Sequence, residues 1–142
     1  MAAGGLVILL DTSVLVDCLT GSRRSLPLLS RAFEQGDRVI LCTIVLYEWL
    51  RGPRSPAELS AQESLFPSES AVAFDSGDAK MSARIYRSLK RPRSREADIA
   101  IAASAIRREG ELWTLNPADF SDIPGLRLAK IQHVAEKPTR RS

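Results

Sequence analysis

The sequence has one histidine, His133, and two cysteines, Cys18 and Cys42, among its 142 residues. A single histidine excludes zinc sites and ribonuclease mechanisms that need two histidines, and its position near the carboxyl end disfavours a histidine-centred triad. Both cysteines lie among apolar residues, so we expect buried reduced thiols, with a disulfide or a metal pair as the less favoured alternatives. Any metal site in this chain must therefore be built mainly from oxygen ligands.

Long apolar runs and glycine-rich phosphate loops are also missing. The apolar run that starts at Leu6 ends at Asp11, which is too short for a membrane span, and no basic leader precedes it. We therefore expect a cytoplasmic protein without a membrane partner. The lack of a phosphate loop argues against nucleotide-driven enzymes.

Positive charge is concentrated in one short stretch. The formal net charge is only +3, yet residues 87–95 hold five positive charges and no negative ones, so the remainder of the chain is net acidic. A basic loop of this kind fits contact with a polyanion, because neutralising phosphates releases counterions. The candidate RNA-binding residues are Arg91, Arg93 and Arg95, and the alternative is a solvated loop without a ligand.

The pattern of apolar residues predicts one α/β domain over residues 1–142, with a core over about 6–131 and a flexible basic tail over 132–142. Short apolar runs alternate with amphipathic segments, which favours a mainly parallel sheet of four to five strands. The expected strands are 6–10, 39–42, 71–74, 112–115 and 126–131. The expected helices are 12–19, 26–35, 43–51, 56–65, 75–89 and 96–109.

Three carboxylates occupy unusual positions for surface residues. Asp11 ends the first predicted strand, at the edge where open α/β sheets bind ligands. Glu48 and Asp98 lie on apolar faces of their predicted helices, where a lone carboxylate is costly unless it is paired or bound to a metal. A buried salt bridge for either residue, or a favourable place for Asp98 near a helix N-terminus, is the structural alternative.

A further polar cluster follows the strand predicted at 112–115. Thr114, Asn116 and Asp119 would lie near Asp11 if the two strands are neighbours, although Asn116 and Asp119 are also ordinary turn residues. Carboxylate, hydroxyl and amide oxygens suit Mg²⁺, with Mn²⁺ as a possible substitute. Such an ion can activate water for attack on a phosphodiester, which is the chemistry of many nucleases.

Four segments together resemble the PIN domain family, and most of all the VapC-type toxins of toxin-antitoxin pairs. They are the motifs LLDTSVLVD at 9–17, YEWLRG at 47–52, EADIAIAA at 96–103 and WTLNPADF at 113–120. Their order and spacing cover most of the chain from residue 6 to about 131. The resemblance implies a PIN-like three-layer α/β/α sandwich around the central sheet.

The resemblance also implies a Mg²⁺-dependent endoribonuclease toxin, commonly a homodimer, that is neutralised by a cognate antitoxin. Cleavage would leave a 5′-phosphate and a 3′-hydroxyl. Asp11 and Asp98 match acids that hold the metal, and Glu48 matches the acid that completes the site and orients water. Asp119 matches an outer acid, while some members carry that acid at the position of Asn116. The hydroxyls that would hydrogen-bond these ligands are those of Ser13 and Thr114.

Other functions remain open on the sequence alone. A catalytically silent PIN-like module could bind RNA or a protein partner through the basic loop, and a DNA-cutting nuclease would use similar acids. A phosphatase of the haloacid dehalogenase type needs a second aspartate where Ser13 stands. A receiver domain needs an acidic pair and a late lysine, neither of which is evident. The sequence does not determine which RNA is cut, or whether one or two metals bind.

Overall fold

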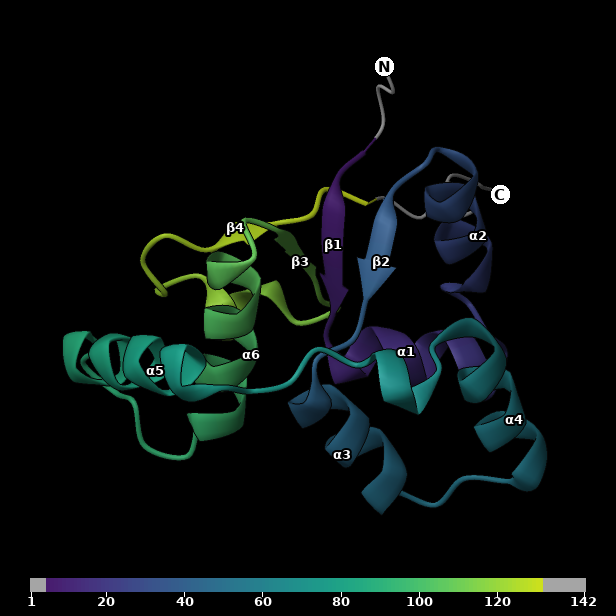
Figure 1. The fold of residues 1–142 in the computed structure, drawn as a ribbon, viewed down its shortest axis with the longest axis horizontal. Coiled ribbons are helices and arrows are strands. Elements are labelled where there is room, and N and C mark those ends of the chain that lie inside the picture. The colour runs from purple at the N-terminus through teal and green to yellow at the C-terminus, as the bar shows by residue number, and fades with distance from the viewer. Residues whose placement is uncertain (1–4, 132–142) are drawn as a thin grey trace, which may run out of the picture.

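The computed structural model describes residues 5–131, which form four strands, six α-helices and two short 3-10 helices (Figure 1). The strands are β1 (Val7–Leu10), β2 (Arg38–Ile40), β3 (Glu111–Trp113) and β4 (Arg127–Leu128). The helices are α1 (Thr12–Leu19), α2 (Leu26–Glu34), α3 (Thr43–Arg51), α4 (Pro56–Leu65), α5 (Ser76–Ser88) and α6 (Glu96–Arg107), with η1 (Ser68–Ser70) and η2 (Pro117–Phe120) between them. The tail predicted at 132–142 lies outside the described residues.

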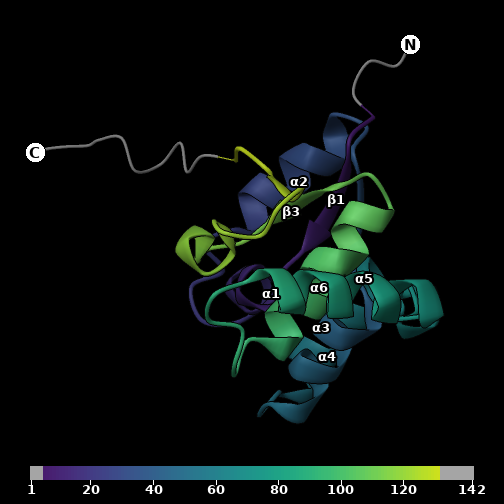
Figure 2. The same ribbon diagram turned by 90° about the vertical axis from the view of Figure 1, so that its left-hand side faces the viewer.

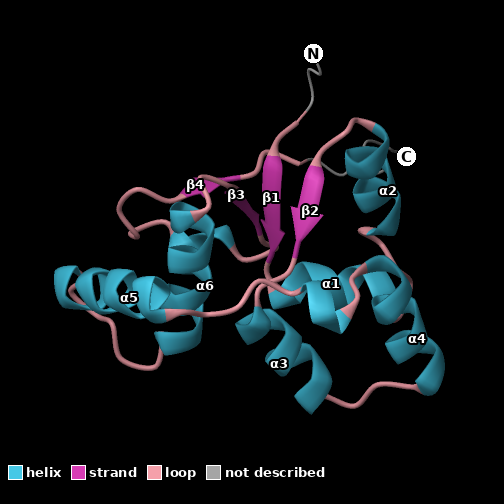
Figure 3. Cartoon of the chain, viewed as in Figure 1, coloured by secondary structure: helices cyan, strands magenta, loops and turns pink. Residues whose placement is uncertain are grey.

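All four strands are parallel, in the order β2-β1-β3-β4. Leu9 of β1 pairs with Ile40 on one side and with Leu112 on the other. The arrowheads of β1 and β2 point toward α1 and α3, so the carboxyl ends of the strands meet these helices at one edge of the sheet (Figure 3). The predicted fold class, an α/β sandwich with a parallel central sheet, is confirmed.

The first strand is central because its side chains are apolar on both faces. Ile8, Leu9 and Leu10 are all buried, as expected for a strand covered on two sides. In Figure 2, β1 runs between α2 on one side and α6 on the other. The small residues of α6 allow this helix to pack closely against the sheet, and Ala102, Ala103 and Ala105 are fully buried. Strand β1 thereby fixes Asp11 at the end of a rigid core element.

The strand predicted at 71–74 is wrong. Only Val72 pairs there, in an isolated bridge in which its amide donates to the Leu41 carbonyl and its carbonyl accepts from the Thr43 amide. Phe74 instead donates its amide to the Thr43 hydroxyl, and Asp75 then caps α5. The chain leaves the sheet at this point because its polar groups are satisfied by α3 and by the start of α5.

The helix boundaries agree closely with the sequence pattern, whereas the strands are shorter than predicted. The last strand comprises Arg127–Leu128 rather than residues 126–131. Cys18 and Cys42 are both buried thiols, as predicted. Among the helices of residues 5–131, none is both long and apolar enough to cross a bilayer.

Candidate active site

Asp11 follows β1 directly and is held by hydrogen bonds on both carboxylate oxygens. Its Oδ1 accepts from the Thr12 amide at 2.8 Å, which also caps α1. Its Oδ2 accepts from the Ser13 hydroxyl at 2.9 Å and from the Thr114 hydroxyl at 2.6 Å. The Asp11 amide donates to the Trp113 carbonyl at 2.9 Å, so the tips of β1 and β3 are joined at this residue. The carboxylate therefore has a fixed orientation.

Backbone amides orient the two hydroxyls that hold Asp11. The Leu115 amide donates to the Ser13 hydroxyl at 3.1 Å, and the Asn116 amide donates to the Thr114 hydroxyl at 3.0 Å. Each hydroxyl oxygen thus accepts from the main chain, and its own proton is directed to Asp11. The segment after β3 therefore supplies a second layer of hydrogen bonds, which holds the two hydroxyls that contact the Asp11 carboxylate.

Thr114→Val is expected to reduce catalysis while leaving the fold intact. Valine keeps the shape of threonine but removes the 2.6 Å hydrogen bond to Asp11, and loss of such a support commonly costs about 10- to 100-fold in activity. Thr20→Val is a matched control, because the Thr20 hydroxyl donates only to the Val16 carbonyl at the end of α1. Cleavage rates and melting temperatures of both variants would be compared, and a fully active Thr114→Val would exclude this role.

Glu48 projects from α3 toward the start of α1. Its Oε1 accepts a 2.5 Å hydrogen bond from the Thr12 hydroxyl, and its Oε2 lies 3.9 Å from Nη2 of Arg51. The Glu48 side chain is 19% exposed, so it is open to solvent on one side. Sequence analysis placed Thr12 only as the first residue of the helix expected at 12–19 and missed this contact. The adjacent hydroxyl in the segment Asp11-Thr12-Ser13 was the available signal.

Asp98 lies in the first turn of α6, and the charges of the other three acids affect its pKa. Burial raises its pKa to about 6, with further contributions from the charges of Asp11, Asp119 and Glu48, while Arg95 acts in the opposite direction. These acids come from the end of β1, from η2 and from α3, respectively. The fold therefore brings the four predicted carboxylates into one electrostatic neighbourhood, at the carboxyl edge of the sheet.

Asp98→Asn is expected to stabilise the metal-free fold at neutral pH. The raised pKa means that ionised Asp98 disfavours folding, and this penalty is present above about pH 6 and disappears as the pH falls toward the unfolded value of about 4. After allowance for solvent screening, the gain at pH 7.5 should be about 1 kcal/mol. Urea unfolding in EDTA at pH 7.5 and pH 4 measures it, and an equal gain at both values would contradict the electrostatic origin.

Asp119 and Asn116 both lie in the exposed segment after β3. Asp119 belongs to η2, and its amide donates to the Asn116 carbonyl at 3.0 Å. The carboxylate of Asp119 is near enough to Asp98 to act on its pKa, whereas Asn116 is tied into the site through its backbone amide. On these contacts we favour Asp119 over Asn116 as the fourth acidic position.

The three candidate arginines of the basic loop have different surroundings. Arg91 and Arg93 are exposed in the loop between α5 and α6. Arg95 is partly buried, and its guanidinium donates to both carboxylate oxygens of Asp122 and to the Asp119 carbonyl. The loop therefore lies beside the acidic cluster, because Arg95 immediately precedes the helix that carries Asp98.

The donor chemistry of the acidic cluster fits a hard divalent cation. Carboxylate oxygens are the ligands preferred by Mg²⁺ and Mn²⁺, and a cation would relieve the repulsion that adds to burial in raising the pKa of Asp98. Within residues 5–131, no group of three acidic, histidine or cysteine side chains is arranged to hold an ion as it stands.

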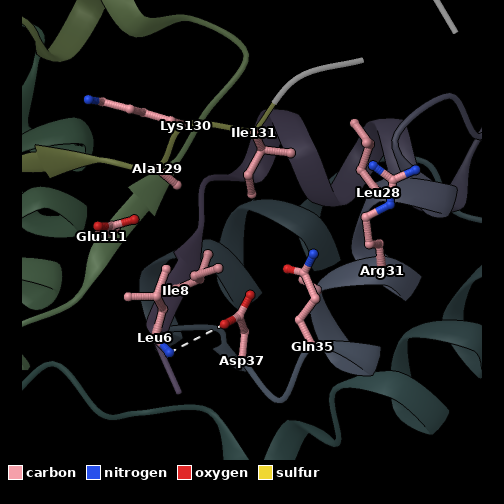
Figure 4. Close-up of a pocket in the computed structure, with 11 residues that line it drawn as sticks. Leu6, Ile8, Leu28, Arg31, Gln35, Asp37, Glu111, Ala129, Lys130 and Ile131 are labelled. Atoms are coloured by element: carbon pink, nitrogen blue, oxygen red, sulfur yellow. Dashed lines mark hydrogen bonds between the residues drawn. The ribbon is translucent and has the colours of Figure 1, made fainter. Parts of the chain in front are cut away.

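A separate cavity of about 200 Å³ lies at the opposite, amino end of the strands (Figure 4). Ile8 of β1 and the preceding Leu6 line it together with Arg31 of α2, and Asp37 accepts a hydrogen bond from the Leu6 amide. None of the predicted site residues lines this cavity. The candidate active site is instead the acidic edge where the strands end.

A parallel α/β sheet with acids gathered beyond its carboxyl ends is the arrangement expected of a PIN domain. The PIN domain family model matches residues 8–126, and the chain belongs to this family. It is 31% identical over 121 residues to Ribonuclease VapC19 of Mycobacterium tuberculosis, which covers 83% of this chain and 95% of that protein.

Solved structures with the same fold come from toxin-antitoxin complexes. The chain matches DNA-bound VapBC from Salmonella typhimurium with a TM-score of 0.73 and 24% identity, over 87% of this chain and 97% of that one. It matches a toxin-antitoxin complex from Klebsiella pneumoniae with a TM-score of 0.64 and 25% identity, over 84% and 94% of the two chains. The similarity thus extends over nearly the whole described fold.

Proposed function

We propose that this protein is a metal-dependent endoribonuclease and the toxin of a toxin-antitoxin pair. The observation that carries the proposal is the gathering of Asp11, Glu48 and Asp119 around Asp98, whose pKa is raised first by burial and then by the charges of these three acids. Repulsion among these acids is costly to the fold, and a bound cation would relieve it. Such a cluster is therefore the arrangement expected of a cation site. The 31% identity to a ribonuclease of the VapC type supports RNA as the substrate.

The residues divide the work between holding a cation and aligning water. Asp11 and Asp98 would hold Mg²⁺, or Mn²⁺ in its place, and Asp119 would contribute an outer oxygen. A bound divalent ion lowers the pKa of its water and stabilises charge on the scissile phosphate. Glu48, fixed by the Thr12 hydroxyl, would accept a hydrogen bond from the attacking water and align it with phosphorus. Displacement of the 3′ oxygen leaves a 3′-hydroxyl and a 5′-phosphate.

Substrate RNA would approach from the basic loop. Arg91 and Arg93 are exposed beside the acidic edge, where they can pair with backbone phosphates on either side of the scissile bond. Their contacts would be independent of sequence, so they position RNA rather than select it. The same loop would also bind RNA if the protein were a catalytically silent PIN-like module. The cleavage experiment described below distinguishes that alternative from a nuclease.

A protein partner would cover the exposed apolar side chains of α3. Tyr47 and Leu50 of this helix are 61% and 50% exposed, and Leu65 at the end of α4 is 38% exposed. The related VapBC structures contain a toxin with its antitoxin, which supports a cognate antitoxin as a partner of this chain. We also propose that the toxin is a homodimer that acts in the cytoplasm, where RNA substrates are available.

Cleavage of total bacterial RNA by the purified protein tests this function. We expect cuts with Mg²⁺ or Mn²⁺, none with EDTA, and none with Asp11→Asn, which keeps the shape of Asp11 but removes its charge. Sequencing of the ends would show 5′-phosphates. If the wild type fails to cut with every metal while it and Asp11→Asn bind RNA equally well, the silent binding module is the better interpretation.

A further inference from the structure

Arg95 joins three segments around the acidic cluster. Its Nη2 and Nη1 donate to Oδ1 and Oδ2 of Asp122 at 2.6 and 3.0 Å, which is a two-pronged ion pair. The same Nη2 donates to the Asp119 carbonyl at 3.0 Å, and Nη1 donates to the Arg91 carbonyl at 3.2 Å. One guanidinium thus connects the basic loop, η2 and the turn that follows η2.

The backbone before Arg95 is shaped to deliver this contact. Ser94 has a φ of 66°, a left-handed backbone conformation that residues other than glycine adopt at a cost. The Arg95 amide then donates to the Pro92 carbonyl at 3.1 Å, which closes the turn. A strained residue persists only where its surroundings hold it in place, and here the Arg95 side chain supplies the holding contacts.

The bridge fixes two of the four acids relative to each other. Asp98 is three residues after Arg95 in the first turn of α6, and Asp119 offers its own carbonyl to the Arg95 guanidinium. The Asp119 side chain is exposed on η2, whereas its neighbour Phe120 is buried in the core and anchors the turn. Because a two-pronged pair between arginine and a carboxylate restricts both distance and angle, it is suited to holding this turn against α6.

We propose that Arg95 and Asp122 are positioning residues that set the place of Asp119 beside Asp98. This inference rests on the proposed function, because it concerns how the cation site is assembled. The role differs from direct contact with RNA, since in this geometry Nη1 and Nη2 of Arg95 both donate to protein oxygens. The bridge lowers the cost of bringing Asp119 and Asp98 together when a cation binds, which is preorganisation of the site.

The variants Asp122→Asn and Arg95→Gln distinguish a positioning role for Arg95 from direct contact with RNA. We expect each to reduce kcat and Mn²⁺ affinity by about 10-fold, with affinity for a labelled RNA oligonucleotide in EDTA changed less than about twofold. The double variant should lose no more than Arg95→Gln alone, because Arg95→Gln already removes the ion pair with Asp122. Melting temperatures would verify that each variant is folded.

If Arg95 instead acts only by gripping RNA, Asp122→Asn frees it, so RNA affinity in EDTA should rise and kcat should not fall. That result would overturn the proposal. Arg93→Gln is the matched comparison in the same loop and should weaken RNA binding without changing Mn²⁺ affinity. A wild type that neither binds Mn²⁺ nor cuts RNA would remove the proposed function itself, whereas an active wild type equalled by Asp122→Asn would remove this inference alone.

Discussion

Replacing Asp98 with asparagine is expected to abolish RNA cleavage, with a loss of about two to four orders of magnitude in kcat, the range typical of a positioned catalytic group. Asp98 is the acid on which the charges of the other three converge, and asparagine fills the same space without the charge that would attract a cation. The variant should fold, because it relieves repulsion rather than creating a cavity. Single-turnover cleavage of a defined RNA in Mg²⁺ measures the loss.

Glu96→Gln is the matched control for Asp98→Asn. Both residues lie in the first turn of α6, but Glu96 is exposed, whereas Asp98 is partly buried. We expect Glu96→Gln to retain its cleavage rate within about threefold, as surface substitutions usually have small effects. An Asp98→Asn variant that cuts as fast as Glu96→Gln would show that the acidic cluster is not the catalytic centre.

Replacing Asp78 with alanine is expected to reduce the free energy of unfolding by about 3 kcal/mol, in the range for breaking a buried ion pair. Asp78 is fully buried in α5, and its Oδ1 accepts from Nη1 of Arg107 at 2.9 Å and from Nη1 of Arg108 at 3.2 Å. Its Oδ2 accepts from the Asp75 amide in the capping box of α5. Alanine would leave two arginines and one amide without their shared acceptor.

The pKa of Asp78 supplies a second way to measure this interaction. Burial raises this pKa, but hydrogen bonds from Arg107, from the Asp75 backbone and from Arg108 outweigh burial, so the pKa lies below its ordinary value. The stabilisation is therefore fully present above the unfolded pKa of about 4, and it is lost as the pH falls through the lower folded pKa. Wild type and Asp78→Ala should converge in stability at very low pH.

Asp75→Asn is the control for the Asp78 experiment. Asp75 is 53% exposed and asparagine can still accept the cap hydrogen bond, so we expect a loss of less than about 1 kcal/mol. Urea unfolding at pH 7 compares the two variants. A loss for Asp78→Ala no larger than that for Asp75→Asn would mean that the arginine network does not secure α5 against α6.

Sequence analysis predicted the parts of this protein that depend on local chemistry. The bounds of α4 follow from Pro56 in its first turn and from Pro67 beyond its end. Asp11 could be placed at a strand end because an uninterrupted apolar run precedes it. Glu48 and Asp98 could be singled out because carboxylates on apolar helix faces need a partner. Periodicity and helix caps are short-range signals, so they can be identified in the sequence without knowledge of the tertiary fold.

Contacts that depend on three-dimensional proximity could not be predicted in the same way. The hydrogen bond from Thr114 to Asp11 spans 103 residues, and it required the order of the strands to be guessed correctly. No periodic pattern in the sequence predicts the contact of Thr12 with Glu48. The same is true of the ion pair between Arg95 and Asp122. The false strand at 71–74 had the right composition, but only Val72 found a partner.

The most direct test of the proposed cation site is a crystal structure of the protein soaked with Mn²⁺, with the metal located by its anomalous scattering. We expect a peak at the carboxyl edge of the sheet, about 2 to 2.5 Å from carboxylate oxygens of Asp11 and Asp98, with Glu48 and Asp119 drawn toward it. The same soak of Asp98→Asn should lose the peak. Strong Mn²⁺ density elsewhere, with none at this edge at saturating metal, would contradict a metal-dependent site built from these four acids.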